Sequence, residues 1–161
     1  MTLQTPLVLA RDEGEHHHFL NNLFTTKVDG ERSGGALTCM EFIGPKDFGP
    51  PLHSHDIEDE LFYVVEGRLW FSCGGIETEQ GPGAVVWLPK GLPHQFQILS
   101  DTARVLQLTT PAQFEELVRT LGEPAQTPTL PVPTEVDGAR VAQVCADFQI
   151  QVLGPPPAPR T

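Results

Sequence analysis

The stretch of sequence that decides the fold is His53-Ser54-His55-Asp56-Ile57-Glu58-Asp59-Glu60-Leu61-Phe62-Tyr63-Val64-Val65-Glu66-Gly67. Its two histidines stand two positions apart, a spacing that places both side chains on the same face of a β-strand. On a helix, residues i and i+2 diverge and could not bind one ion together. The apolar run that begins at Glu60 has the residue types of a following strand. The stretch therefore predicts two consecutive strands, each with ionisable side chains near its start.

A second patch, Gly83 to His94, supplies one more imidazole beside another strand-like run. A single His-x-His pair is common on protein surfaces, but this second patch favours a metal site. Three imidazoles and one carboxylate, from His53, His55, Glu60 and His94, suit a divalent transition metal, and the set leaves Fe, Mn, Ni, Co, Cu and Zn open. It contains the two-histidine, one-carboxylate set of non-haem iron oxygenases. Because His94 lies far along the chain, we expect the ligands to meet across several strands.

The two patches read His53-x-His55-x4-Glu60-x6-Gly67 and Gly83-x5-Pro89-x-Gly91-x2-His94. They resemble the two-motif signature of the cupin superfamily. The resemblance implies an all-β fold, a jelly-roll-like β-barrel that holds one metal per chain through those four side chains. Asp47 stands near the position of the signature's leading glycine, and Ile98 replaces its closing asparagine. Neither position is a ligand, so metal binding is still expected.

Within the cupins, the chain is similar to single-domain proteins of the quercetin 2,3-dioxygenase type. The segments that carry this similarity are Gly49–His55, Glu58–Gly67, Phe114–Leu117, Leu121–Pro124 and Ile150–Pro156. The resemblance implies a dioxygenase whose partners are dioxygen and a small aromatic or enolic substrate, with Glu60 also acting as the base for a flavonol hydroxyl. Two alternatives stay open: a metal-containing cupin that binds a small molecule without turnover, and a non-oxidative metal-dependent isomerase or lyase.

Strand alternation suggests which side chains could form the wall of a substrate site. Phe62 and Val64 share the face of Glu60, and Phe96 and Ile98 share the face of His94. Pro51 shares the face of His53. The alternative is that these side chains simply fill the barrel, since the inward positions of small barrels are usually packed.

Turn residues divide the rest of the chain into short strand-like runs, the pattern of an all-β barrel or sandwich. We expect strands at about Phe19–Val28, Gly35–Ile43, Glu60–Glu66, Arg68–Cys73, Gly74–Gln80, Ala84–Leu88, His94–Leu99 and Ala103–Thr109. Gly67 is expected at a tight hairpin turn between two of them. We divide the single domain into an N-terminal arm with the first strands (1–34), the barrel core (35–110) and a C-terminal extension (111–161).

The C-terminal extension changes period and predicts short helices packed outside the barrel. Residues 111–122 carry apolar side chains on one face, with Thr110 as the expected N-cap and Pro111 in the first turn. A proline-rich connector follows, and a second helix is expected at about Glu135–Asp147. The segment from Ile150 is expected either to dock as a strand or to lie along the surface.

Composition excludes several partner classes. The formal net charge is −11, which argues against nucleic acid and anionic membranes as partners. The sequence has no apolar run long enough to span a membrane and no secretory signal pattern, and its three widely spaced cysteines do not suggest a disulfide framework. We therefore expect a cytoplasmic protein. We also expect a homodimer, with Phe19–Val28 as the candidate pairing segment.

Two further clusters of ionisable residues need an interpretation. Asp56, Glu58 and Asp59 are expected to be solvated loop charges, with Asp59 as the alternative ligand to Glu60. The run His16-His17-His18 is expected to be a partly exposed lead into a strand, with His17 turned inward.

Overall fold

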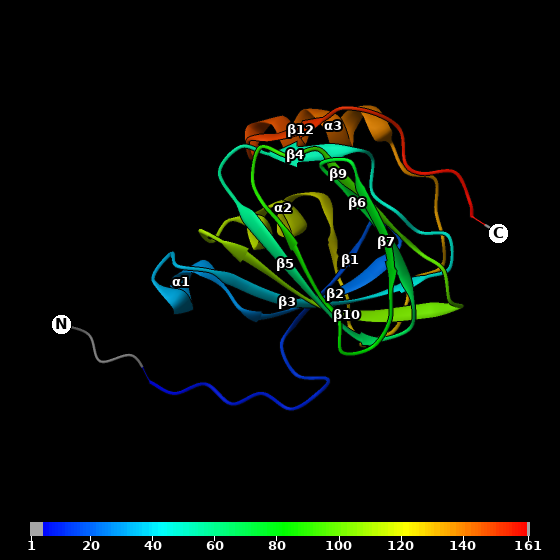
Figure 1. Cartoon of the computed structure of the whole chain (residues 1–161). Helices are drawn as coiled ribbons and strands as arrows, with labels where there is room; N and C mark the ends of the chain where they lie inside the picture. The colour runs from blue at the N-terminus through cyan, green and yellow to red at the C-terminus, as the bar shows by residue number, and fades with distance from the viewer. Residues whose placement is uncertain (1–4, 161) are drawn as a thin grey trace.

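Two antiparallel sheets face each other in the computed structural model, which describes residues 5–160 (Figure 1). Within those residues the larger sheet has the strand order β11-β1-β2-β3-β10-β5-β8 and the smaller one the order β12-β4-β9-β6-β7. The strands are β1 (Glu15–Phe19), β2 (Asn22–Val28), β3 (Thr38–Pro45), β4 (His53–His55), β5 (Asp59–Glu66), β6 (Leu69–Cys73), β7 (Ile76–Gln80), β8 (Val85–Leu88), β9 (His94–Ile98), β10 (Thr102–Thr110), β11 (Glu123–Pro124) and β12 (Ile150–Val152). The predicted all-β, jelly-roll-like barrel is confirmed.

The barrel interior is filled largely by phenylalanine side chains. In β3 every second residue is buried, so one face of the strand points inward. The ring of Phe42 stacks on Phe24 at 5.2 Å and on Phe96 at 5.6 Å between centroids, and Phe96 also meets Phe62 at 5.5 Å. Aromatic pairs at these separations stabilise the fold by more than the burial of their apolar area alone. The aromatic core therefore fixes the spacing of the two sheets.

The N-terminal run expected as one strand is a hairpin. Leu20 and Asn21 form the turn between β1 and β2, and both have positive φ. The side chain of Asn22 donates to the carbonyl of Leu20, which stabilises the turn. The three histidines of 16–18 lie within β1 rather than ahead of it, and His17 is 5% exposed, as its expected inward orientation requires. Strand β2 is paired on both sides, with β1 and β3, so Phe19–Val28 offers no free edge along β2.

The expected hairpin at Gly67 is not formed. Strand β5 pairs with β10 and β8, whereas β6 pairs with β9 and β7, so Gly67 carries the chain from one sheet to the other. Its φ is +87°, and a Cβ at this position would lie 2.5 Å from the carbonyl oxygen of Thr102. Only glycine fits this crossing without strain.

Short helices lie outside the sheets, at α1 (Gly30–Ser33), α2 (Phe114–Leu121) and α3 (Gly138–Asp147). The helix expected from residue 111 begins later, because Thr110 is the last residue of β10 and Gln113 takes the N-cap position. Asp137 is the N-cap of helix α3, and its side chain accepts a hydrogen bond from the backbone N–H of Arg140. None of the helices in the described residues is long and apolar enough to cross a membrane.

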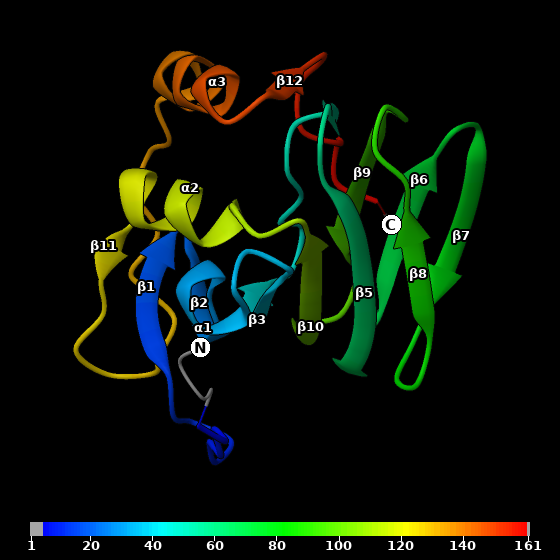
Figure 2. The same ribbon diagram turned by 90° about the vertical axis from the view of Figure 1, so that its left-hand side faces the viewer.

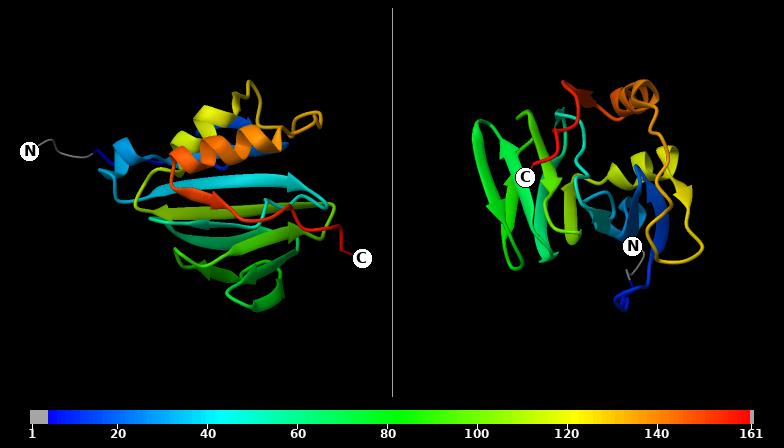
Figure 3. Two further views of the ribbon diagram at one scale, coloured as in Figure 1. Left: turned by 90° about the horizontal axis from the view of Figure 1, so that it is seen from above. Right: turned by 90° about the vertical axis from the view of Figure 1, so that its right-hand side faces the viewer.

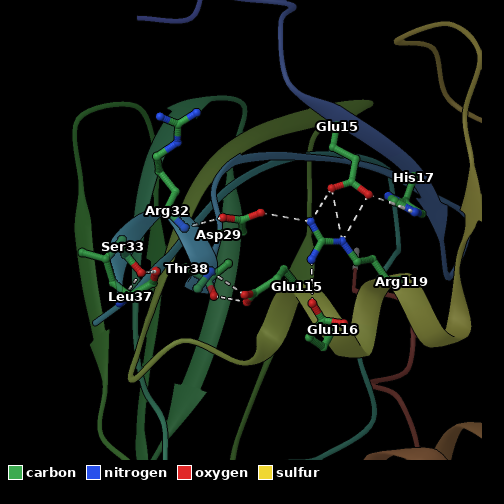
Figure 4. Close-up of polar contacts among 11 residues, drawn as sticks. Glu15, His17, Asp29, Arg32, Ser33, Leu37, Thr38, Glu115, Glu116 and Arg119 are labelled. Carbon is green, nitrogen blue, oxygen red and sulfur yellow. Dashed lines mark hydrogen bonds and ion pairs between the residues drawn. The ribbon is translucent and has the colours of Figure 1, made fainter. Parts of the chain in front are cut away.

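Polar contacts anchor α2 to the N-terminal part of the chain (Figure 4). Arg119 forms ion pairs with Glu15, Asp29 and Glu116. One turn earlier, the buried carboxylate of Glu115 accepts from the backbone N–H of Gly30 and from the hydroxyl of Thr38. Helix α2 is thus fixed in position against the barrel.

The last strand docks onto the barrel, the first of the two arrangements left open for it. Strand β12 pairs antiparallel with β4, with Ile150 opposite His55 and Val152 opposite His53. Figure 2 shows α3 and β12 together above α2 and the barrel. In the right-hand view of Figure 3, residues 5–14 lie at the bottom of the molecule and α3 lies at the top. The C-terminal segment therefore covers the end of the barrel that holds β4.

Candidate metal centre

Four predicted ligands meet at one end of the barrel. His53 and His55 come from β4, His94 from the paired strand β9, and Glu60 from β5 of the facing sheet. One nitrogen or oxygen atom from each lies within 4.8 Å of the corresponding atom of every other. His55, Glu60 and His94 are buried, and His53 is half-buried. The centre therefore joins the two sheets, as the predicted inward orientation of these residues requires.

Each imidazole is oriented by a hydrogen bond at Nδ1. The Nδ1 atom of His53 lies 2.7 Å from the carbonyl oxygen of Pro51, and that of His94 lies 2.9 Å from the carbonyl oxygen of Leu92. The Nδ1 atom of His55 lies 2.9 Å from a carboxylate oxygen of Glu58. Because carbonyl and carboxylate oxygens only accept, the proton stands on Nδ1 in each ring. The Nε2 atoms are then the ones free to bind a cation.

The Nε2 atoms face a negative charge. His94 Nε2 lies 2.9 Å from Glu60 Oε2, and His55 Nε2 lies 3.6 Å from the same oxygen. His55 Nε2 is buried and has no hydrogen-bond partner within residues 5–160. Lone pairs of nitrogen and oxygen at these distances repel unless a positive charge stands between them or on a ring. This donor set fits a divalent transition metal.

The charges at the site follow from burial and from the neighbouring groups. Burial, helped by the adjacent His94, lowers the pKa of His53 to about 3. Burial also lowers the pKa of His55, but the carboxylates of Glu60 and Glu58 outweigh it, so the pKa of His55 is raised overall. Burial would raise the pKa of Glu60, but His55 and His94 hold it well below its ordinary value. Glu60 is therefore a carboxylate at neutral pH.

Two supporting residues were not identified from the sequence. Glu58, expected as a solvated charge, is fully buried and hydrogen-bonds His55. Gln107, in β10, is 3% exposed and donates from Nε2 to Glu60 Oε1 at 2.8 Å. The sequence does contain a signal for Gln107, because strand alternation places this glutamine on the same inward face as Val105 and Thr109. Asp59, the alternative ligand, instead accepts from the backbone N–H of Lys90 and lies outside the four-residue group.

Of the five residues expected to form the wall of a substrate site, three line a hollow and two do not. Phe62 and Phe96 line a small hollow of about 50 Å³ beside Glu60, His94 and Gln107. Pro51 lines a second hollow of about 60 Å³ next to His53 and His55. Val64 and Ile98 are fully buried in the core and line neither hollow.

Comparisons with known proteins show a family match and support the fold. Residues 40–109 match the family model described as a cupin domain. The chain is 25% identical to a quercetin 2,3-dioxygenase of Bacillus subtilis over 151 residues, which is 93% of this chain and 45% of the relative. It is 31% identical over 121 residues to the quercetin 2,3-dioxygenase of Aspergillus japonicus, covering 68% of this chain and 34% of that relative. The chain thus spans less than half the length of these two relatives.

Among solved structures, a protein described as a predicted oxalate decarboxylase from Thermotoga maritima matches with a TM-score of 0.59. The two sequences are 15% identical, and the match covers 65% of this chain and 99% of that one. At this identity the similarity concerns the fold alone.

Proposed function

The chain contains a cupin domain, and on that premise we propose that it is a metal-dependent dioxygenase for a flavonol-like or other enolic or phenolic small molecule. The observation that supports this most is the arrangement of three imidazoles, each oriented through Nδ1, around the carboxylate of Glu60. A divalent metal bound there would supply Lewis acidity and a template for the substrate oxygens. The distant similarity to quercetin 2,3-dioxygenases agrees with this reaction class.

The chain's own residues would hold the site in a fixed charge state. Gln107 binds Glu60 Oε1, so Glu60 Oε2 is turned toward His94 and His55. We assign Glu60 as the group that accepts the substrate hydroxyl proton. Its lowered pKa makes it a weak base, so it can take a proton only from a hydroxyl that is itself unusually acidic. The apolar side chains around the site would keep bulk water away during this transfer.

The proposal is tested by dissolved-oxygen uptake. Metal-free protein is loaded separately with Fe, Mn, Co and Ni, its metal content is measured, and quercetin is added. We expect metal-dependent oxygen uptake together with loss of the flavonol absorbance. His55→Ala protein treated in the same way should show neither change. Confirmed metal loading without oxygen uptake for any metal would remove quercetin as the substrate.

One observation favours the alternative of a binding protein without turnover. Glu60 Oε1 already accepts from Gln107, and Glu60 Oε2 faces the Nε2 atoms of His94 and His55, where a bound metal would engage it and leave no uncommitted base among these groups. Flavonol binding that is unaccompanied by oxygen uptake would support this second function. Conversion of an enolic substrate without oxygen consumption would instead indicate isomerase or lyase chemistry.

A further inference from the structure

An apolar groove leads away from the candidate metal centre, between β4 and the C-terminal helices. One side is formed by β4 with His53 and His55. Strand β12 lies next to β4 on the same side, and the other side is formed by the helices α2 and α3, which lie above the barrel (Figure 2). Together α2, α3 and β12 contribute Phe114, Leu117, Val141, Cys145, Ile150 and Val152. We call this feature the C-terminal groove.

The side chains that line the C-terminal groove are almost all apolar. Among the described residues that line it there is no acidic, basic, amide or hydroxyl side chain, apart from the imidazoles of His53 and His55. The thiol of Cys145 is a weak hydrogen-bond donor, and burial raises its pKa to about 11, so it stays uncharged. The groove therefore offers a ligand one polar end, at the metal centre, and an apolar body.

The groove wall is built by parts of the chain outside the matched cupin domain. That domain ends at residue 109, whereas α2, α3 and β12 begin at residues 114, 138 and 150. These elements are held in place by specific contacts. Gln113 donates to the carbonyl of Phe148, and β12 pairs with β4 directly opposite the two histidines. The wall is consequently a fixed feature of this chain rather than of the barrel core.

From these observations we propose that the C-terminal groove selects substrates that join one metal-chelating enol group to an uncharged body without further hydroxyl groups. The proposal rests on the proposed function, because the metal centre must bind the enol oxygens. A hydroxyl group buried against Leu117, Val141 or Ile150 would lose its bonds to water and find no side-chain partner. Such a loss weakens binding by about tenfold for each unpaired group.

The rim of the groove is the place to test this proposal. The hollow beside His53 and His55 measures about 60 Å³, so it encloses the part of a ligand that adjoins the enol group, and a larger body reaches the rim of the groove. Val152 stands at that rim, opposite His53 in the β12–β4 ladder. The next residue, Leu153, is 49% exposed and does not line the groove. The two positions form a matched pair for substitution.

The first test compares three uncharged probes that share one chelating head. Maltol is the head alone, 3-hydroxyflavone adds apolar rings, and quercetin adds hydroxyl groups to those rings. Each is titrated without oxygen into zinc-loaded protein of measured metal content, and binding is followed by the absorbance of the chelated enol. We expect 3-hydroxyflavone to bind at least about tenfold more tightly than maltol, because its rings bury apolar surface. We expect quercetin to bind at least about tenfold more weakly than 3-hydroxyflavone.

The second test places a large side chain at the rim. Val152→Trp should weaken 3-hydroxyflavone binding by about tenfold or more and leave maltol binding unchanged, since maltol needs only the metal centre. Leu153→Trp should change neither. Val152 is half-buried and packs against the core, so the circular dichroism spectrum checks the fold and the zinc content checks the metal centre in both variants.

The outcomes separate this proposal from the proposed function. Quercetin binding as tightly as 3-hydroxyflavone, maltol binding as tightly as 3-hydroxyflavone, or equal effects of the two tryptophan variants would each overturn the selectivity proposal while leaving the metal centre intact. Failure of wild-type protein to take up zinc would overturn the metal centre, and with it this proposal.

Discussion

The metal centre and the C-terminal groove lie side by side but are built in opposite ways. The four candidate ligands lie within residues 40–109, which match the cupin-domain model, on strands of both sheets, and every one has at least one hydrogen-bond partner. The groove wall comes from α2, α3 and β12 and offers almost no polar partner. The difference separates two tasks. We expect changes among the polar contacts to affect metal binding, and changes in the wall to affect only which molecule binds.

The largest effect should follow from removing a ligand. His55→Ala removes a buried imidazole whose Nε2 faces Glu60, so most bound metal should be lost while the barrel stays folded. The metal content after dialysis measures the loss of bound metal, and the circular dichroism spectrum shows whether the barrel is still folded. His16→Ala is the matched control, because His16 lies in β1 and hydrogen-bonds Thr25 instead. Full metal occupancy in the His55→Ala variant would remove His55 from the ligand set.

A smaller effect should follow from removing the carboxylate behind His55. Glu58→Ala leaves His55 Nδ1 without its acceptor, and loss of such a partner lowers metal affinity by about 10- to 100-fold. Glu58→Gln should recover part of the loss, because its amide oxygen can still accept. Affinity is measured by competition with a zinc chelator. Asp59→Ala serves as the control, and an equal loss in both variants would contradict a specific role for Glu58.

Gln107 should matter less than Glu58, because it acts on the carboxylate rather than on an imidazole. Gln107→Ala frees Glu60 Oε1 and should lower zinc affinity by about tenfold, at the lower end for such supporting contacts. The same chelator competition measures it. Gln80→Ala, on the edge strand β7, is a glutamine control remote from the site. Unchanged affinity in Gln107→Ala would show that Glu60 needs no support.

The smallest effect concerns a buried histidine that takes no part in the centre. Burial holds the pKa of His17 below its ordinary value, so the unfolded chain binds a proton more readily than the folded one. Stability therefore falls as the pH drops through about 6.5, the value for an unfolded histidine, toward the lower folded pKa. His17→Phe removes this loss and also removes a buried Nδ1 atom that has no hydrogen-bond partner in the described part of the chain. The substitution should raise the unfolding free energy at pH 5 by about 1 kcal/mol.

Urea unfolding of metal-free protein at pH 5 and pH 8 measures that difference. Zinc content should not change in His17→Phe protein. A loss of stability at pH 5, or a loss of bound zinc, would show that His17 has a role that its surroundings do not reveal.

The ligand set could be predicted because local rules determine it. Alternation along a strand places His53 and His55 together, and a glycine or proline marks the ends of the strands that carry Glu60 and His94. Glu58 could not be recognised in the same way. It stands in a run of acidic residues, which usually indicates solvated charge, and only the three-dimensional arrangement shows that it is the one turned back toward His55.

The groove wall was beyond prediction for a different reason. Its side chains come from two helices and the last strand, and only long-range docking brings them together. The pairing of β12 with β4 depends on an unoccupied strand edge that no local pattern reveals. The crossing at Gly67 could not be predicted for the same reason. A hairpin turn and a change of sheet have the same local sequence pattern, and only the pairing partners of β5 and β6 distinguish them.

X-ray absorption at the zinc edge of zinc-loaded protein tests the central claim most directly. The account predicts scattering from three imidazole rings and one carboxylate oxygen, with zinc–nitrogen and zinc–oxygen distances of about 2.0–2.2 Å. Cys73 stands opposite His94 in the β6–β9 ladder and is the nearest competing type of ligand in the register. A sulfur atom at about 2.3 Å, or fewer than three imidazoles, would contradict the assignment of His53, His55, Glu60 and His94 as the metal centre.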